Sequence, residues 1–550
     1  MGNKEVNAWQ ARHKNAYRIE YRNMKEENIT VNVCEPDGYL HHAWEECICS
    51  GTPYLYITPE KNYAEQITSH LKDVHDNLGF KRVYFDRINA FEPYITTYFE
   101  DKDGNPMYDW KQVDDIYEKI LSIGIKPFVM IAAIPKAIAS DPNNTNFDGG
   151  NSSAPKDYVK WKQYCKNFVR HLIEKYGEPE VTSWYFQILN EPEIRNLYWS
   201  DSFEEYLRSY DYAATGIKEA NSSIKVGPGG FAFTGGHLIA AFVDHVTSFN
   251  YDPEGDPNGA PFDYINTHGY PLPCAGSMRD DFEKIEKYMI SHFGPDHNKE
   301  LIISEWNSDA GPGLSSATHD GAMNAAFVMR QVTECSREFF NNPDKIRFFA
   351  FWCHSDVFDE LGEPDSEFPG LFGLITRNGI RKPNYNAFKM LRMLGRSRIR
   401  ILGGNSEVNG IATYNDEKIT IILHNCLYDI KRAEGDSRYN RIINLKVENI
   451  PWSKVKVEHY RIDDLRSNAY TAWKQIGSPK DCTDEQMEYL KSKMNLELLE
   501  EPCTVDTVIG IYRAQFGLPM PSVSMIVITP VEREYVIPDG SHYRVLGFLK

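Results

Sequence analysis

The sequence lacks the features that mark several large classes of protein. No apolar run approaches the roughly 20 residues that a membrane helix needs, and the first residues contain no apolar segment of the kind that directs secretion. The 10 cysteines form no Cys-x-x-Cys pair and show no spacing with histidine that suits a metal ion, which favours free thiols in a reducing compartment. We therefore expect a cytoplasmic protein with no membrane partner and no metal. A leader absent from this sequence would be the exception.

Basic residues are few relative to acidic ones. The 550 residues include 60 Lys and Arg against 78 Asp and Glu, for a net charge of -18. Because proteins that follow nucleic-acid phosphates usually carry a basic surface, we do not expect nucleic acid as a partner. Aromatic residues are abundant, at 13%. Most of them are expected in the core, and the alternative for a minority is a cleft lined with rings that stack on sugars.

Short apolar runs alternate with helical segments between residues 35 and 395. In Tyr63–Leu78 and Tyr158–Tyr176, apolar residues recur every three or four positions, which predicts amphipathic helices. The sequence has eight strand-like runs: Cys47–Ser50, Arg82–Asp86, Pro127–Ile134, Trp184–Asn190, Ile224–Gly227, Tyr264–His268, Leu301–Glu305 and Phe348–Cys353. Eight such units favour the α/β class and a (β/α)8 TIM barrel over an open sheet.

The pattern changes after about residue 396. Short β-branched runs separated by turn signals predict a C-terminal β-sandwich over 396–550. A helical insertion near 483–494 begins with Thr483 and has Gln486 three residues later, as in a capping box. The N-terminal segment, 1–34, contains one strand-like run and is expected to pair with the sandwich. The barrel is predicted over 35–395.

Two glutamates stand where a barrel places its chemistry, at the C-terminal ends of strands. Glu191 follows the fourth apolar run, and Glu305 ends the seventh. Paired carboxyl groups suit glycoside hydrolysis, because one can protonate the leaving oxygen while the other attacks the anomeric carbon. A gap of about 5–5.5 Å between them gives retention, and about 6.5–9.5 Å gives inversion. The alternative, a salt bridge closing each strand, is less favoured for two glutamates at two such positions.

An ordered set of motifs extends this reading. Asn190-Glu191-Pro192, with Glu305, resembles the clan of retaining glycosidases with barrel folds. From about residue 28 to 530 the sequence is similar to glycoside hydrolase family 39, and more to its β-xylosidase branch than to its α-L-iduronidase branch. Stretches that carry this resemblance include Leu78-Gly79-Phe80-Lys81, Ser183-Trp184-Tyr185-Phe186, Asp263–His268, Ser467-Asn468-Ala469-Tyr470 and Trp473–Pro479.

The resemblance implies a retaining exo-glycosidase with Glu191 as general acid/base and Glu305 as nucleophile. No cofactor is implied, because the two carboxyl groups carry the chemistry. Substrate-binding roles are implied for Asn190 (the sugar 2-hydroxyl), His268 (the floor of the site), Tyr270 (the nucleophile's carboxylate), Trp352 (an aromatic platform) and Glu360 (the far hydroxyls). Core packing is the alternative for His268 and Trp352, and a solvated loop charge for Glu360.

The wall of the sugar pocket departs from the family pattern. Relatives carry Arg-Phe-His-Gly at the second strand, and this sequence has Tyr84-Phe85-Asp86-Arg87. Ala133 stands where relatives place an aromatic residue, and Leu189 stands where they commonly have Trp. We expect Asp86 to accept hydroxyl hydrogen bonds. Arg87 is expected either to meet a substrate carboxylate or to pair with Asp86.

These departures leave several functions open. The leading one is a β-xylosidase-like enzyme that trims short plant-type oligosaccharides. Alternatives are an arabinosidase, glucosidase, galactosidase or uronidase of the same family, transfer to acceptors other than water, and a catalytically impaired sugar-binding protein. An iduronidase is less favoured because Gly269-Tyr270, without a lysine, follows His268. A homo-oligomer is a modest expectation.

Overall fold

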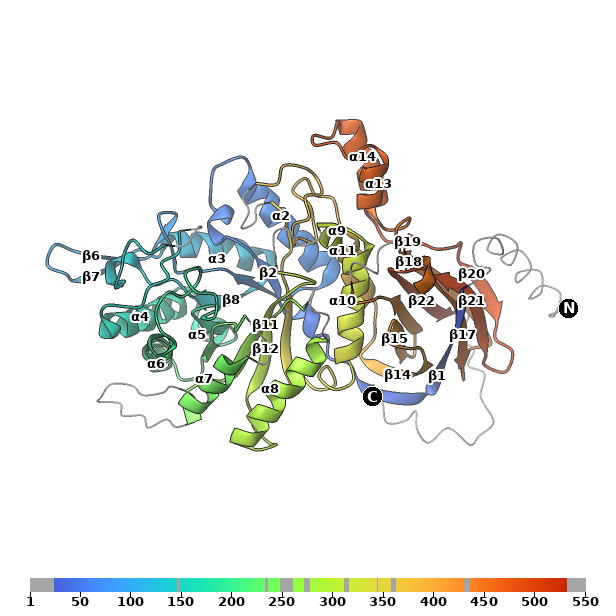
Figure 1. The fold of residues 1–550 in the computed structure, drawn as a ribbon, viewed down its shortest axis with the longest axis horizontal. Helices are drawn as coiled ribbons and strands as arrows, with labels where there is room; N and C mark the ends of the chain where they lie inside the picture. Colours follow the sequence, from blue (N-terminus) through green and yellow to red (C-terminus); the bar gives the residue numbers. More distant parts are fainter. Residues whose placement is uncertain are drawn as a thin grey trace. The chain divides into compact units, whose positions relative to one another are not determined.

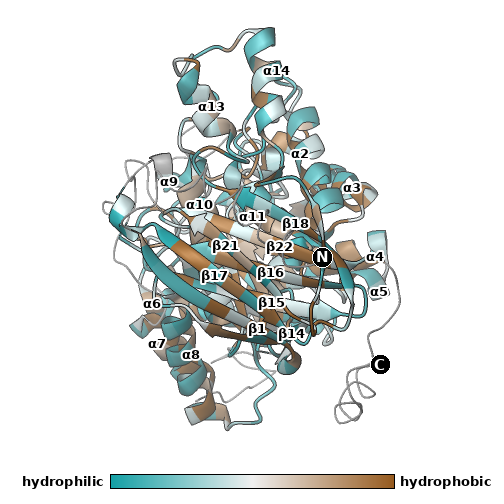
Figure 2. Ribbon diagram, turned by 90° about the vertical axis from the view of Figure 1, so that its right-hand side faces the viewer, coloured by the Kyte–Doolittle hydropathy of each residue, from teal (hydrophilic) through white to brown (hydrophobic). Residues whose placement is uncertain are grey.

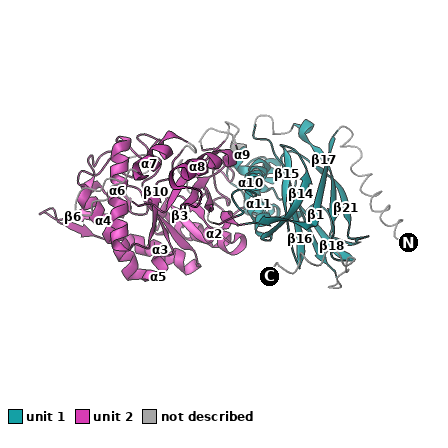
Figure 3. Ribbon diagram, turned by 90° about the horizontal axis from the view of Figure 1, so that it is seen from below, with its two compact units in different colours: residues 1–40, 317–341, 381–550 teal, residues 41–316, 342–380 magenta. Residues whose placement is uncertain are grey.

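The protein forms two compact units (Figure 3). Unit 1 comprises residues 1–40, 317–341 and 381–550, and unit 2 comprises 41–316 and 342–380. Within these ranges, the computed structural model describes residues 24–145, 149–232, 236–247, 261–271, 277–310, 316–343, 345–357, 363–429 and 436–531. Among the helices of these residues, none combines the length and apolar character that crossing a bilayer requires.

Unit 2 contains a parallel sheet of eight strands, which confirms the predicted barrel. Its strands overlap the eight predicted runs: β2 (Ile48–Ser50), β3 (Arg82–Phe85), β8 (Lys126–Ile131), β9 (Tyr185–Ile188), β10 (Lys225–Pro228), β11 (Tyr264–Gly269), β12 (Glu300–Trp306) and β13 (Ile346–Phe351). They pair in the order β10-β9-β8-β3-β2-β13-β12-β11. The two end strands, β10 and β11, approach each other. Asp263 N–H donates to Val226 O at 2.8 Å, and Phe231 forms an isolated parallel β-bridge with Thr267. The ring is therefore nearly closed.

Helices surround the barrel strands in the unit (Figure 1). Two of them, α2 (Tyr63–Leu78) and α4 (Tyr158–Tyr176), have the predicted bounds. The others are α3 (Lys111–Ile123), α5 (Glu178–Val181), α6 (Phe203–Ala220), α7 (His237–Thr247) and α8 (Met278–Phe293). Gly79 ends α2 with a φ of 81°, a left-handed conformation that glycine adopts without strain.

The loops of unit 2 carry short elements. Three 3-10 helices are η1 (Ala43–Glu45), η2 (Pro53–Tyr56) and η3 (Lys136–Ile138). Two small hairpins follow β3, formed by β4 (Ala90–Phe91) with β5 (Ile95–Thr96) and by β6 (Tyr98–Glu100) with β7 (Pro106–Tyr108).

Unit 1 is built on a ten-stranded sheet, and one face of its strands surrounds an apolar core. Its strands are β1 (Lys25–Tyr39), β14 (Ser397–Gly403), β15 (Val408–Asn415), β16 (Lys418–Asn425), β17 (Arg441–Glu448), β18 (Lys454–Ile462), β19 (Glu497–Leu498), β20 (Cys503–Asp506), β21 (Tyr512–Leu518) and β22 (Ser522–Pro530). Buried and partly exposed residues alternate along β17, and Figure 2 shows hydrophobic and hydrophilic segments alternating there. This alternation gives β17 one face toward the core.

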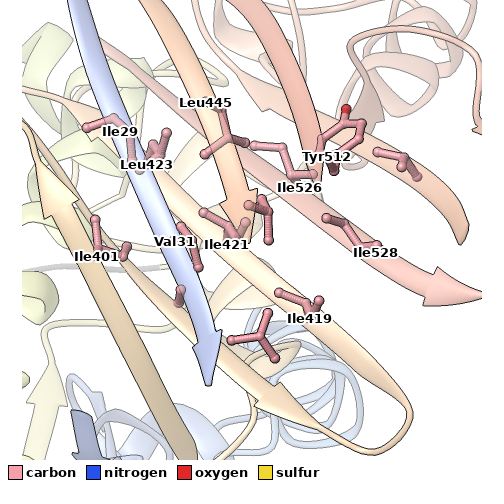
Figure 4. Close-up of a cluster of buried hydrophobic side chains, with 14 of the residues drawn as sticks. Ile29, Val31, Ile401, Ile419, Ile421, Leu423, Leu445, Tyr512, Ile526 and Ile528 are labelled. Carbon is pink, nitrogen blue, oxygen red and sulfur yellow. The ribbon is translucent and has the colours of Figure 1, made fainter. Parts of the chain in front are cut away.

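The strand that precedes the barrel completes this sheet. β1 pairs antiparallel with β14 and parallel with β17. The parallel pair differs from the antiparallel pairing that is usual in a β-sandwich. β1 is not joined to β17 by a hairpin, so chain connectivity does not impose the antiparallel direction. Figure 4 shows Ile29 and Val31 of β1 among the aliphatic side chains of β16, β17 and β22.

Unit 1 also includes several helices. They are α10 (Ala322–Cys335), preceded by α9 (Ser316–Asp320), then α11 (Pro383–Arg392), η4 (Ser437–Tyr439), α13 (Ala469–Gln475) and α14 (Asp484–Lys493). At the start of α14, Thr483 and Gln486 form a reciprocal capping box.

Candidate active site

The predicted site residues that the structure describes come from the C-terminal ends of five barrel strands. They are Asp86 and Arg87 after β3, Asn190 and Glu191 after β9, His268 in β11 with Tyr270 after it, Glu305 in β12, and Trp352 after β13. Because parallel strands end at one edge of the barrel, residues far apart in the sequence meet there. Glu360 lies outside the described residues.

His268 lies between the two glutamates. Its Nδ1 is 2.6 Å from Glu191 Oε1 and 3.5 Å from Glu305 Oε2. The Tyr270 hydroxyl donates to Glu305 Oε2 at 3.1 Å. The ring of His268 is fully buried, and both glutamates are buried with less than a tenth of their surface exposed. The structure therefore brings four of the predicted residues into one hydrogen-bonded group.

An irregularity in β12 makes this group possible. Thr267 pairs with Ile303, but the next residue, His268, pairs with Glu305, so Ser304 is an extra residue in the strand. Consecutive strand residues normally face opposite sides, and a bulge changes this. His268 consequently contacts both Ser304 and Glu305, because its Nε2 is 3.0 Å from Ser304 Oγ and its Nδ1 is 3.5 Å from Glu305 Oε2.

Burial sets the protonation of the histidine and of its glutamate partner. Burial raises the pKa of Glu191 to about 8, with further contributions from the charges of Glu193 and Asp86, and Arg87 acts in the opposite direction. Burial lowers the pKa of His268. At neutral pH both groups are therefore uncharged. The Nδ1–H of the neutral ring can then donate to Glu191 Oε1 while Nε2 accepts from the Ser304 hydroxyl, which leaves the carboxyl proton on the other oxygen of Glu191. Glu191 is thus protonated at neutral pH.

A second network orients Asn190. The Gln187 side-chain amide donates to Asn190 Oδ1 at 3.1 Å, and Asn266 Nδ2 donates to Gln187 Oε1 at 2.6 Å. Asn266 Oδ1 accepts from Ser304 N–H at 3.2 Å. The amide of Asn190 is thereby linked through two side chains to the backbone next to Glu305.

Two glycines after β10 leave room for these side chains. A Cβ at Gly230 would lie 1.9 Å from His268 Nε2, and one at Gly229 would lie 2.6 Å from Leu189 O. The backbone at Gly230 also accepts from Glu191 N–H at 3.0 Å. Any side chain at Gly230 would therefore displace the histidine.

Asp86 and Arg87 form an ion pair on the wall of the site. Arg87 is buried, with 3% of its surface exposed, and its guanidinium lies over the ring of Tyr198 at 5.1 Å. Its φ of 51° falls in the left-handed region that favours glycine, the residue of the family pattern at this position. Of the two expectations for Arg87, the structure has the pairing with Asp86.

The aromatic residues at the site are mostly covered. Trp352 is 7% exposed and belongs to a buried cluster that includes Tyr84, Phe128 and Tyr185, with Tyr270 packed against it. Ala133, which replaces an aromatic residue, is buried, and its carbonyl oxygen accepts from Asn89 Nδ2 at 2.8 Å.

Sequence reasoning missed the residues that support the glutamates. Ser304, Gln187, Asn266, Glu193 and Gly230 carry no motif of their own. The feature that could have identified them is their position in the sequence, because each lies in or just after a barrel strand.

Three of the buried groups could also serve as metal ligands. Glu191, His268 and Glu305 each offer one ligand atom, and these atoms lie within 4.8 Å of one another. A cation held there would occupy the space between the two carboxyl groups. It would therefore block any substrate on which they act.

A barrel that brings two buried carboxyl groups together at the C-terminal edge of its strands has the architecture of a glycoside hydrolase. The sequence model of "Glycosyl hydrolases family 39" matches residues 27–498. The chain belongs to this family, and its substrate is a carbohydrate.

Individual proteins similar to this chain are consistent with this family assignment. The chain is 29% identical over 475 residues to a β-xylosidase of Caldicellulosiruptor saccharolyticus, covering 84% of this chain and 90% of the relative. It is 28% identical over 524 residues to a β-xylosidase of Geobacillus stearothermophilus, covering 93% and 97%. The crystal structure of a monomeric β-xylosidase from Caulobacter crescentus CB15 has the same fold, with a TM-score of 0.75 and 23% identity, over 92% of this chain and 100% of that one.

Proposed function

We propose that this family 39 glycosidase is a retaining, β-xylosidase-like exo-enzyme acting on short plant-type oligosaccharides. The observation that carries the proposal is the pair Glu191 and Glu305, whose nearest carboxyl oxygens lie within 4.8 Å of each other. A separation this short is below the gap of about 6.5–9.5 Å of inverting enzymes and nearer to the gap of about 5–5.5 Å typical of retaining enzymes.

In the first step, Glu191 gives its proton to the glycosidic oxygen as the bond to the anomeric carbon breaks. Glu305 attacks that carbon and forms a glycosyl-enzyme ester. Glu191, now ionised, then takes a proton from water, the water oxygen attacks the anomeric carbon, and Glu305 leaves as a carboxylate. His268 keeps Glu191 in place through both steps, and the Tyr270 hydroxyl orients Glu305. An acceptor alcohol in place of water would give transfer.

Sugar-binding roles follow from the surroundings of the pair. We assign Asn190 to the sugar 2-hydroxyl, because its amide is held by the Gln187 network next to Glu191. Asp86 is assigned to a further hydroxyl and Trp352 to the apolar face of the ring, while Arg87 acts by holding Asp86. The role of Glu360 remains a prediction from the resemblance.

The charges favour a neutral sugar over a uronic acid. Glu193 and Asp86 are close enough to raise the pKa of Glu191. Arg87, the cation at this wall, is already paired with Asp86. A substrate carboxylate would therefore meet mostly negative charge. Of the alternatives, an arabinosidase, glucosidase or galactosidase stays consistent with this environment, and a uronidase is disfavoured.

An intact acid and nucleophile argue against a catalytically impaired binding protein, since a binding site needs neither the raised pKa nor the ordered carboxylate. We further propose that the enzyme acts on imported oligosaccharides in the cytoplasm and that it forms homo-oligomers, as the sequence suggests.

The test is an assay of aryl β-xyloside, arabinoside, glucoside, galactoside and glucuronide, with the product anomer followed by NMR. We expect xyloside hydrolysis with retention. Glu305→Ala should abolish turnover, and Glu191→Ala should keep activity only toward good leaving groups, with rescue by azide. Glu118→Ala, at an exposed position on α3, is the matched control. Inert xylosides would overturn the sugar, and an inverted product would overturn the mechanism.

A further inference from the structure

Two stacked tyrosines lie on the loops that follow the first two barrel strands. Tyr54 belongs to η2, after β2, and Tyr94 lies in the turn between β4 and β5, after β3. Their ring centroids are 4.1 Å apart, and the planes differ by 10°. Because these loops leave the C-terminal edge of the barrel, the stack lies on the same edge as Glu191 and Glu305.

Tyr94 has an aromatic surface that is not buried in the core. It is 49% exposed, whereas Trp352 and Phe91 are buried. Because Tyr54 covers one face of the Tyr94 ring, the opposite face and the ring edges are the surface of the ring that a ligand could reach. A large apolar surface left open beside a binding site marks a place where a ligand can pack.

The stack is held in one orientation. Tyr54 also contacts Phe91, with centroids 5.4 Å apart, and Tyr94 N–H donates to Phe91 O at 2.8 Å. Gln112 of α3 donates to Tyr94 O at 2.7 Å and accepts from Thr96 N–H at 3.1 Å. A ring fixed in this way loses little conformational entropy when a ligand binds.

A continuous series of contacts joins the stack to the wall of the site that carries Asp86 and Arg87. The Arg87 guanidinium lies 5.7 Å from the centroid of the Phe91 ring on which Tyr54 and Tyr94 rest. Arg87 is paired with Asp86, and both act on the pKa of Glu191. An exo-enzyme holds one sugar beyond the scissile bond, so any further sugar unit that reaches the stack belongs to the leaving group.

We propose that Tyr94, backed by Tyr54, binds the sugar units on the leaving-group side of the scissile bond. The ligand is an oligosaccharide whose pyranose ring lays its C–H face on the open face of Tyr94. This inference rests on the proposed glycosidase function, and it extends that function from a terminal sugar to the chain that carries it. It applies to whichever sugar the enzyme releases.

The experiment compares two substrates of the sugar that the wild-type enzyme hydrolyses: a tetrasaccharide and the glycosyl fluoride. Fluoride is too small to reach the stack, whereas an aryl group could itself pack there. We expect Tyr94→Ala to lower kcat/KM for the tetrasaccharide about three- to tenfold more than for the fluoride, the range that one aromatic contact supplies. Tyr94→Phe keeps the ring and should restore most of the loss.

Tyr39→Ala is the matched control, because Tyr39 is 44% exposed on β1 of unit 1. It should leave both substrates within about twofold of wild type. Equal losses of Tyr94→Ala on the two substrates, or no loss on either, would overturn the inference. Failure of the proposed function is seen separately, in the wild-type enzyme, as inert xylosides or an inverted anomer.

Discussion

At the scale of single residues, the environment of Glu191 is the chemical centre of this protein. The side chain is buried beside an uncharged histidine and near two further acidic groups, so its carboxyl retains a proton to about pH 8. Between the ordinary carboxyl pKa and pH 8, the folded chain holds a proton that the unfolded chain has lost. Stability therefore declines as the pH rises through this window, and Glu191→Gln should remove that dependence.

The same shift predicts the pH dependence of catalysis. In the proposed mechanism Glu191 must be protonated in the free enzyme, so kcat/KM should fall as the pH rises through about 8. Glu193→Gln removes a charge that raises the pKa of Glu191, so it should move this alkaline limb to lower pH. The measurement is a pH profile of kcat/KM, with the exposed Glu118→Gln as control. A limb that does not move would contradict the electrostatic role of Glu193.

At the scale of elements, the site depends on irregular strand ends. The β11–β12 register slips by one residue, so that Ser304 and Glu305 both contact His268. After β10, the backbone passes so close to the histidine ring that only glycine fits. Strand periodicity alone predicts neither feature, because both depend on which neighbouring strand each end meets.

Gly230→Ala tests the close approach of β10. The added Cβ would lie 1.9 Å from His268 Nε2, and the ring has no free volume because it is fully buried. We expect kcat/KM to fall about a hundredfold, the cost typical of a 1 Å displacement of a catalytic group. Gly395→Ala is the control, since its Cβ would make only an ordinary contact with Thr413 Oγ1 at 3.5 Å. A Gly230→Ala enzyme within about threefold of wild type would show that His268 tolerates displacement.

At the scale of the whole molecule, the candidate active site and the ten-stranded sheet belong to different units. The described site residues all lie in unit 2, and the sheet that includes β1 lies in unit 1. β1 precedes the barrel strands in the sequence, whereas its partners β14 and β17 follow them. The pairing of these strands therefore joins two parts of the chain that are far apart in the sequence.

Ile421→Ala separates stability from activity. Ile421 is fully buried in the unit 1 core, and such truncations cost about 2–5 kcal/mol. We expect calorimetry to give a lower melting temperature while kcat/KM at 25 °C stays at the wild-type value. Lys456→Ala, on the exposed face of β18, should change stability by less than about 0.5 kcal/mol. A large loss of activity in Ile421→Ala would show that the site depends on the unit 1 core.

The sequence by itself determined the barrel, because strand and helix periods are local and eight apolar runs marked its strands. It also singled out Glu191, Glu305, His268 and Tyr270, since strand ends and family motifs can be read along the chain. Only the tertiary structure decided that His268 joins the two glutamates, that Arg87 pairs with Asp86, and that Tyr94 stacks on Tyr54. The physical reason is that register slips, pKa shifts and ring contacts arise between residues that only the closed barrel brings together.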